Sequence, residues 1–196
     1  GLKRLNIIDY DNPIKEVKKL KSRQSEMRFL SHEEIRRLLF VLQNSEHPEV
    51  SLIAEICLST GARWGEAERL TNSRLQKNKV TFADNKNGKN RSIPINDYLY
   101  DKLKKHATEV GENQLFQPSM KMFYRALDMA NITLPKGQKT HVLRHSFASH
   151  FMINGGNILS LQRILDHSSI SMTMKYAHLS PNHMLDALQY NPLHRK

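Results

Sequence analysis

Apolar positions recur at the three- and four-residue spacing of α-helices over most of the chain after Ser31. Ser31 and Glu34 make a capping-box pair, which predicts that a first helix begins at Ser31 and runs to residue 43. Pro48 opens a second predicted helix, because proline is tolerated in the first turn, and Gly61 interrupts that helix. The remaining predicted helices cover residues 63–70, 96–107, 119–130, 141–153, 157–167, 170–179 and 181–190.

Two short stretches, residues 79–83 and 91–95, instead follow the two-residue alternation of β-strands. The segment between them, DNKNGKN, is rich in asparagine and glycine, which favour tight turns. This pattern predicts a β-hairpin with Lys86 and Lys89 near its tip. We therefore expect a mainly α-helical chain with one small antiparallel β-sheet, which is an α+β fold.

Apolar anchors are sparse at the start of the chain, where the stretch NPIKEVKKLKSRQ is basic and polar. We expect residues 1–27 to be a basic linker, residues 28–182 to form one globular domain and residues 183–196 to form a C-terminal tail. The length of 196 residues and the apolar share of 39% suit one domain with a substantial core.

Membrane and disulfide-rich classes do not fit this sequence. It has no run of about 18 apolar residues, which a membrane-spanning helix needs. Its N-terminus lacks the pattern of a signal peptide. The single cysteine, Cys57, excludes an internal disulfide and lies in the apolar run LIAEICL. We expect Cys57 to be a small core residue in a reducing, cytoplasmic setting.

The charge balance indicates a polyanionic partner. Thirty Lys and Arg residues against nineteen Asp and Glu give a formal net charge of +11. Such an excess favours nucleic acid and, less often, an anionic membrane surface. A basic surface that serves only solubility is the alternative.

The stretch THVLRHSFASH places His141, Arg144 and His145 close together on one predicted helix. A metal ion, a phosphate group and ordinary packing are the three interpretations. Helical zinc-binding histidine pairs carry a carboxylate, whereas this pair encloses an arginine, so a metal is the weakest of the three. The arginine fork binds phosphate oxygens, and histidine can both donate to an oxygen and move a proton. Packing remains open for any single histidine, above all for His145 and His150.

Distant segments carry further residues of the kind that binds or attacks a phosphate. Arg63 follows the break at Gly61 and lies near a helix start, where anions are favoured. Tyr176 follows His167 by nine residues. A tyrosine hydroxyl, with an ordinary pKa of about 10, needs a neighbouring base or positive charge to attack at neutral pH. Lys86 in the predicted hairpin offers a proton or a further positive charge.

Taken in order, these residues resemble the catalytic domain of the tyrosine recombinases. The motifs that carry the resemblance are TGAR, NKNGKNRSIPI, HVLRH, LDHSS and KYAH, over about residues 29 to 182. The likeness is greatest to P2-like phage integrases, through TGARW, LPKGQKTHVLRHSFASHFMINGGNIL and MTMKYAHLSP. Asp166 is a departure, because the family usually has glycine there. Its carboxylate could raise the basicity of His167 or simply face solvent.

The resemblance implies a site-specific recombinase that integrates and excises phage DNA through a 3′-phosphotyrosine, without metal, ATP or another cofactor. Tyr176 would attack the DNA phosphodiester, and Lys86 would protonate the leaving 5′ oxygen. His141 would accept the Tyr176 proton or position the phosphate. The other implied residues are Arg63, Arg144 and His167 as charge stabilisers, Lys89 and Arg91 as DNA contacts, and Glu66 and His145 as supporting residues.

The resemblance also implies partners. We expect double-stranded DNA at an attachment-site core, a homo-oligomer on that DNA, namely a tetramer, and accessory DNA-bending proteins of host and phage. The full-length protein would carry core-binding and arm-binding domains before this chain and would act on DNA in the bacterial cytoplasm. The tail, residues 183–196, would dock on a neighbouring subunit or pack on its own domain.

Other functions stay open at the level of sequence. A non-catalytic DNA-binding module could keep the same fold, although it would have no need of the complete set of Arg, Lys, His and Tyr residues. A type IB topoisomerase would use similar chemistry without strand exchange. Tyr190 competes with Tyr176 as nucleophile by position alone.

Overall fold

Helices make up most of the computed structural model, which describes residues 27–83, 90–139, 141–181, 187–188 and 191–193. This confirms the mainly helical fold with one small antiparallel sheet. The helices are α1 (His32–Gln43), α2 (Glu49–Thr60), α3 (Trp64–Glu68), α4 (Asp97–Val110), α5 (Met120–Met129), α6 (Val142–Ile153) and α7 (Ile158–Leu165). None of the helices in the described ranges is both long and apolar enough to cross a membrane.

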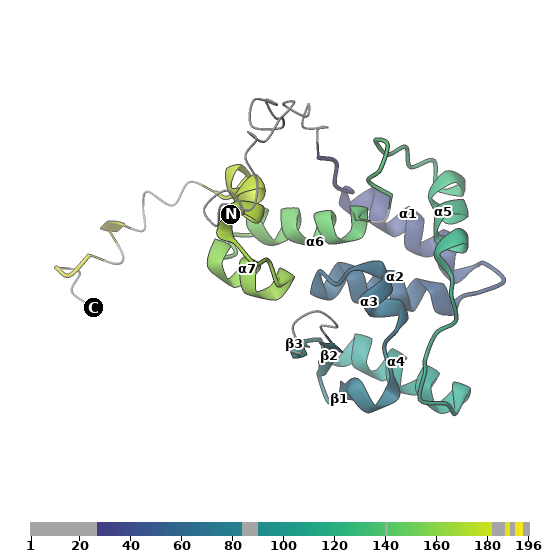
Figure 1. The fold of residues 1–196 in the computed structure, drawn as a ribbon. Helices are drawn as coiled ribbons and strands as arrows, with labels where there is room; N and C mark the ends of the chain where they lie inside the picture. Colours follow the sequence, from purple (N-terminus) through teal and green to yellow (C-terminus); the bar gives the residue numbers. More distant parts are fainter. Residues whose placement is uncertain (1–26, 84–89, 140, 182–186, 189–190, 194–196) are drawn as a thin grey trace, which may run out of the picture.

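The helix α2 lies at the centre of the molecule, where it contacts α1, α3, α4 and α6 (Figure 1). Its sequence is apolar around most of its circumference, and a helix of that kind is stable only when it is covered on several sides. Ile53, Ile56 and Cys57 are accordingly buried. Cys57 is thus the small core residue that the sequence predicts.

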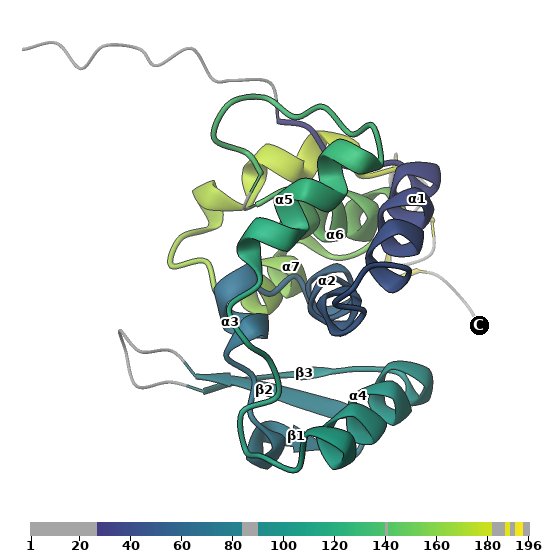
Figure 2. The ribbon, with the colours of Figure 1, turned by 90° about the vertical axis from the view of Figure 1, so that its right-hand side faces the viewer.

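The sheet and α4 form a layer of their own beside the helices α1, α2, α5 and α6 (Figures 1 and 2). The strands β1 (Leu75–Gln76), β2 (Lys79–Ala83) and β3 (Asn90–Pro94) are antiparallel in the order β1-β2-β3. The predicted hairpin corresponds to β2 and β3, in which Phe82 pairs with Arg91. The two-residue strand β1 was not predicted, because it is too short to show alternation. The expected tip, with Lys86 and Lys89, lies outside the described residues.

The segment that carries Tyr176 departs from the sequence prediction. A continuous helix was predicted over residues 170–179, but the structure has two short 3-10 helices, η3 (Ile170–Met172) and η4 (Met174–Leu179). The backbone N–H of Thr173 donates to Ile170 O at 2.8 Å, and that of Tyr176 donates to Thr173 O at 3.0 Å. Such i→i+3 bonds have poorer geometry than α-helical bonds, so these turns depend on packing against the rest of the domain.

Gly61 ends α2 in a left-handed conformation with φ of 68°. A Cβ atom at this position would lie 2.6 Å from Phe147 Cδ1 and 2.7 Å from Leu165 Cδ2. Both the positive φ and the close approach require glycine. The chain therefore turns sharply here and brings the end of α2 against α6 and α7.

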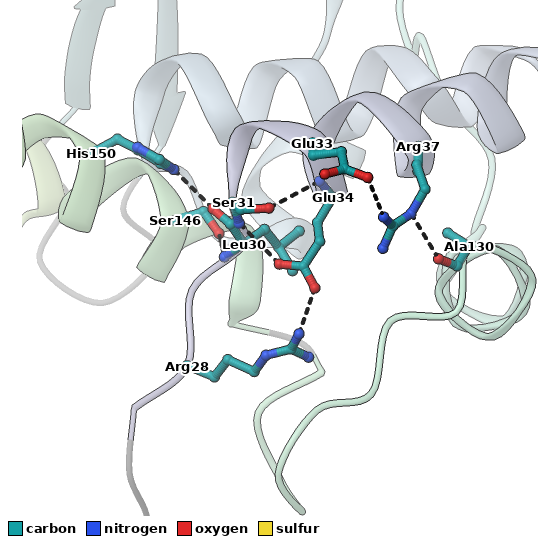
Figure 3. A network of polar contacts seen from close by, with 9 residues as sticks. All are labelled: Arg28, Leu30, Ser31, Glu33, Glu34, Arg37, Ala130, Ser146 and His150. Atoms are coloured by element: carbon teal, nitrogen blue, oxygen red, sulfur yellow. Dashed lines mark hydrogen bonds and ion pairs between the residues drawn. The ribbon is translucent and has the colours of Figure 1, made fainter.

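The chain enters the domain along α6 through polar contacts of residues 28–30 (Figure 3). The Leu30 N–H donates to Ser146 Oγ at 2.8 Å, and His150 Nε2 lies 2.8 Å from Leu30 O. The Arg28 N–H donates to Gln138 Oε1 at 3.0 Å. His150 therefore has a structural partner, in line with the packing interpretation of that histidine.

The predicted start of the first helix is confirmed by its hydrogen bonds (Figure 3). The Glu34 N–H donates to Ser31 Oγ at 3.2 Å, and the Ser31 N–H donates to Glu34 Oε2 at 3.0 Å. The same carboxylate pairs with the Arg28 guanidinium through its other oxygen. The capping box therefore also holds the entering chain in place.

Candidate active site

Arg144 is the most deeply placed charged residue of the candidate site, with 5% of its surface exposed. Its Nη1 donates to Gly61 O at 2.9 Å, and its Nη2 donates to Leu165 O. The guanidinium thus ties α6 to the ends of α2 and α7, while its other N–H donors remain for a ligand. Burial and the charges of Arg63 and Arg91 lower the pKa of Arg144 to about 10, so the group stays cationic at neutral pH.

Arg63 and Arg91 share one carboxylate, that of Glu66. Arg63 is the N-cap residue of α3, and its Nη1 donates to Glu66 Oε1 at 2.8 Å. Arg91, from β3, donates through Nη2 to Glu66 Oε2 at 2.9 Å. Burial alone would raise the pKa of Glu66, but the Arg63 backbone N–H and the two guanidinium charges hold it below its ordinary value. Glu66 is therefore an anion between two cations.

The Tyr176 hydroxyl forms a hydrogen bond with His145. Tyr176 Oη lies 2.7 Å from His145 Nδ1, which joins η4 to α6. The Tyr176 residue is 1% exposed and packs with Ala148, Leu161 and Leu165. The nucleophile expected from the sequence thus lies in a small apolar cluster with its hydroxyl against an imidazole.

Burial opposes ionisation of both members of this pair, and nearby positive charge adds to that effect only at His145. Burial raises the pKa of Tyr176 to about 12, although the charge of Arg144 acts in the opposite direction. Burial, together with the charge of Lys175 and further cations, lowers the pKa of His145 to about 4. At neutral pH the hydroxyl is therefore protonated and the imidazole is neutral, so His145 can accept the hydroxyl proton.

His167 lies just after α7 and is held by Thr173. His167 Nδ1 is 2.8 Å from Thr173 Oγ1. Burial, followed by the charge of Arg144, lowers the pKa of His167 to about 4. Asp166 is exposed and has a left-handed φ of 52°. That conformation explains why glycine suits this position and why aspartate can replace it, and the exposure agrees with a carboxylate that faces solvent.

His141 is the N-cap residue of α6, one turn before His145. The rings of His141 and His145 have centroids 6.1 Å apart. Partial burial and the charges of Arg144, Arg63 and Lys175 lower the pKa of His141. Within the described residues, the hydrogen bond of Tyr176 Oη goes to His145 and not to His141. The structure therefore brings a different imidazole to the tyrosine than the one that the sequence suggested.

Two residues of the site were not singled out from the sequence. Lys175 Nζ lies 5.0 Å from the centre of the Tyr176 ring, and burial and Arg144 lower the pKa of this lysine. Its place directly before Tyr176 could have indicated it. Thr173 is fully buried against His167. Its role depends on the fold of η3 and η4, and no sequence signal marks it. The predicted residues Lys86 and Lys89 lie outside the described part of the chain.

The arrangement suits an anionic ligand with a reacting phosphorus centre. Arg63, Arg91 and Arg144, from three separate elements, act electrostatically on one another and on His167, and Arg144 also acts on Tyr176. Fixed donors of this kind stabilise negative charge that develops on phosphate oxygens in a transition state. The hydroxyl of Tyr176 supplies the oxygen nucleophile, and His145 supplies the proton acceptor.

Comparisons with known proteins show the family of this chain. The profile described as "Phage integrase family" matches residues 28–183. The integrase of Haemophilus phage HP1 is 49% identical over 98% of this chain and 56% of its own length. The integrase of Escherichia phage P2 is 43% identical over 93% of this chain and 52% of its own length. The chain thus spans just over half the length of these relatives.

Solved structures share the fold. The catalytic domain of bacteriophage HP1 integrase has a TM-score of 0.80 and 52% identity, covering 86% of this chain and 97% of that domain. The Tn1549 transposon integrase, solved in complex with a circular intermediate DNA, has a TM-score of 0.69 and 21% identity, covering 87% of this chain and 66% of that one.

The fold and the order of site residues define a tyrosine recombinase catalytic domain, as the sequence predicts. Within that class, the chain belongs to the phage integrase family. The HP1 and P2 integrases among its relatives confirm the expected likeness to the P2-like group.

Proposed function

We propose that this chain cuts and rejoins DNA strands in a site-specific recombination that integrates and excises phage DNA. One observation carries the proposal. The Tyr176 hydroxyl is 2.7 Å from a neutral imidazole, in a site whose cations include the buried Arg144. A module that only binds DNA has no need to pair a buried phenol with a proton acceptor beside guanidinium groups.

The proposed reaction exchanges one phosphodiester for another. Tyr176 Oη attacks the phosphorus atom, and its proton passes to His145 Nδ1. The bond from phosphorus to the 5′ oxygen breaks, Lys86 gives that oxygen a proton, and a 3′-phosphotyrosine remains. A 5′-hydroxyl of another strand then attacks the phosphotyrosine and releases Tyr176. The number of phosphoester bonds does not change, so no external energy source is needed.

The charges of the site have distinct tasks in this scheme. Arg63 and Arg144 stabilise the negative charge that gathers on the nonbridging oxygens by their positive charge, and His167, which is neutral at pH 7, does so as a hydrogen-bond donor. The pKa values of His145 and Tyr176, about 4 and about 12, lie too far apart for the proton to move in the free domain. A bound phosphodiester adds negative charge, which favours the protonated imidazole, so the proton moves only as the attack proceeds.

Tyr176 has to become accessible before it can react, because only 1% of its surface is exposed. The short 3-10 turns η3 and η4 carry it, and they are the segment that we expect to shift when DNA binds. The movement would carry the hydroxyl from the apolar cluster toward the bound phosphate.

The partner is double-stranded DNA at an attachment-site core, supported by the net charge of +11 and by the phosphate-binding chemistry of the site. Full recombination requires several active sites, so we propose a homo-tetramer on DNA, with accessory DNA-bending proteins and with the further domains that the longer relatives have room for. Exchange of residues 183–196 between subunits belongs to the same proposal. In a bacterial host this reaction takes place on cytoplasmic DNA.

A covalent trapping experiment tests the function. A nicked duplex that loses a short strand after cleavage cannot be rejoined, so the intermediate accumulates on a denaturing gel. We expect a protein–DNA adduct, and peptide mass mapping should place the nucleotide on Tyr176. Absence of any adduct under conditions in which the chain binds the duplex would refute a catalytic function.

The pH dependence of adduct formation tests the role of His145. Because the pKa of His145 is about 4, its imidazole stays neutral and able to accept a proton well below pH 6.5. We expect kcat/KM to stay level from about pH 8 to about pH 5.5 and to fall only as the pH approaches the His145 pKa of about 4. The reason is that kcat/KM reports the ionising groups of the free enzyme. A decline centred near pH 6.5 would contradict this assignment.

Substitution of the imidazole gives a second measurement of the same role. His145→Phe should slow adduct formation by roughly a hundredfold or more, the usual size of a lost general base. His141→Phe is the matched control, one turn earlier on α6. If the control loses more activity than His145→Phe, then His141 accepts the proton.

The hairpin lysines can be separated by a change of leaving group. Lys86→Ala should slow cleavage far more than Lys89→Ala, because only Lys86 is expected to protonate the 5′ oxygen. A substrate with sulfur in place of that oxygen leaves without a proton and should restore the rate of Lys86→Ala. If sulfur restores nothing, the lysine acts through its charge alone.

A further inference from the structure

Arg91 is a largely buried arginine whose surroundings do not suit a surface contact. Its side chain is 12% exposed, and its Cζ lies 5.3 Å from the centre of the Phe82 ring. Nη2 donates to Glu66 Oε2 at 2.9 Å, whereas Nε and Nη1 are buried without a hydrogen-bond partner in the described structure. The cost of burying this cation is offset mainly by one carboxylate.

That carboxylate is also the one that holds Arg63. Glu66 Oε1 accepts from Arg63 Nη1 at 2.8 Å, and Glu66 Oε2 accepts from the Arg63 backbone N–H at 2.8 Å. Glu66 is 18% exposed in its side chain, while Arg63 is 44% exposed. The inner arginine and the outer arginine therefore share the charge of a single anion, and the outer one faces the solvent side where a DNA phosphate would arrive.

Because Arg63 and Arg91 share the Glu66 carboxylate, this cluster keeps a positive charge. Two guanidinium groups and one carboxylate leave a net positive charge. Without Arg91, the Glu66 carboxylate would pair with Arg63 alone and would cancel the positive charge that Arg63 presents to a phosphate. Without Arg91, Glu66 Oε2 would also lose a charge-assisted donor that fixes its rotamer.

We propose that Arg91 is a positioning residue that acts through Glu66, keeping Arg63 oriented and its positive charge uncancelled for the scissile phosphate. This inference rests on the proposed function. It gives Arg91 a role different from the direct DNA contact that the sequence suggested, and it links the strand β3 to the reacting phosphate through Glu66 and Arg63.

In a double-mutant cycle, we expect the second substitution, Glu66→Gln, to restore activity that the first, Arg91→Met, removes. Arg91→Met should slow adduct formation at saturating nicked duplex by about 10–100-fold, the size of a weakened oxyanion contact. The DNA concentration that gives half the maximal rate should change little. Adding Glu66→Gln to Arg91→Met should recover most of the lost rate, because no carboxylate then cancels the charge of Arg63.

Several outcomes overturn the proposal. If Arg91→Met weakens DNA binding and leaves the saturated rate unchanged, Arg91 contacts DNA directly. If adding Glu66→Gln fails to restore the saturated rate of Arg91→Met, an uncancelled Glu66 charge is not the cause of the loss. If the double variant regains the melting temperature but not the rate, the pair serves the fold alone, since removing both members of a buried ion pair relieves the cost of an unpaired charge. Arg74→Met, at an exposed arginine of the 3-10 helix η2 (Asn72–Arg74), is the control for general loss of positive charge.

Anion binding tests the same idea without catalysis. Inorganic sulfate can be titrated into the free chain while the Arg63 Nε–H resonance is followed by NMR. Arg91→Met should weaken sulfate binding at Arg63, and Arg91→Met with Glu66→Gln should restore it. Equal binding in all variants would overturn the inference. A wild-type chain that binds sulfate in this pattern but forms no adduct would refute only the proposed function.

Discussion

Tyr176→Phe is expected to abolish the covalent protein–DNA adduct while DNA binding and the fold persist. The substitution removes one oxygen atom, and no other group in the described structure pairs an oxygen nucleophile with His145. The loss should be complete rather than partial, because the phenylalanine ring has no atom that can attack phosphorus. Trapping on the nicked duplex and a filter-binding assay measure the two properties separately.

The fold should change little in this variant. The aromatic ring still fills the cluster formed with Ala148, Leu161 and Leu165. The lost hydrogen bond to His145 is worth about 1 kcal/mol. Tyr190→Phe is the matched control and should form the adduct at the wild-type rate. An adduct of normal yield in Tyr176→Phe would move the nucleophile elsewhere, with Tyr190 the first residue to examine.

Arg144→Met should impair both chemistry and stability. In the proposed function the Arg144 guanidinium binds the scissile phosphate. In the structure without DNA it donates hydrogen bonds to Gly61 O and Leu165 O. Removing it should slow adduct formation by about 100-fold to 1,000-fold or more. The two carbonyl groups that lose their partner should cost about 2–4 kcal/mol, which corresponds to a melting temperature lower by roughly 5–15 °C.

Arg63→Met provides the contrast. Arg63 is 44% exposed in its side chain, and its hydrogen bonds go to Glu66 within the same short helix. Its replacement should slow adduct formation to a similar degree and leave the melting temperature within a few degrees of wild type. Equal melting temperatures for Arg144→Met and the wild type would show that the carbonyl contacts of Arg144 carry no weight in stability.

The elements that the sequence predicted well are those with strong local signals. The capping box at Ser31, the first-turn Pro48 and the break at Gly61 are all local, and the structure confirms the helix boundaries at these points. The strand β1 and the 3-10 turns η3 and η4 lack such signals, since each is too short to show a period. Their conformation depends on contacts with distant parts of the chain.

In the candidate site, too, local motifs could be recognised from the sequence, whereas contacts between distant residues could not. Short motifs singled out Arg63, Arg144 and Tyr176 as candidates, because each motif is a contiguous stretch that can be recognised without knowing the fold. The hydrogen bond between Tyr176 and His145 joins residues 31 positions apart and depends on how η4 returns to α6. No local pattern encodes that return, so His141 and His145 could not be told apart.

Arg91 carries a local sequence signal for burial. Strand alternation places Arg91 on the same face of β3 as Ile93, which is buried. Alternation alone therefore indicated that the arginine side chain turns toward the interior. An inward arginine needs an anion nearby, and Glu66 was the acidic residue already associated with Arg63.

The contacts of residues 28–30 with α6 determine where this domain can be joined to other polypeptides. Leu30 is fully buried, and its N–H and carbonyl oxygen are bound by Ser146 and His150, on the helix that also carries Arg144. A chimera whose junction falls before residue 27 keeps these contacts intact. A junction at residue 31 would leave polar groups of α6 without partners and an apolar gap beside them. For exchange of DNA-recognition segments between relatives, the usable splice point thus precedes the first helix by several residues.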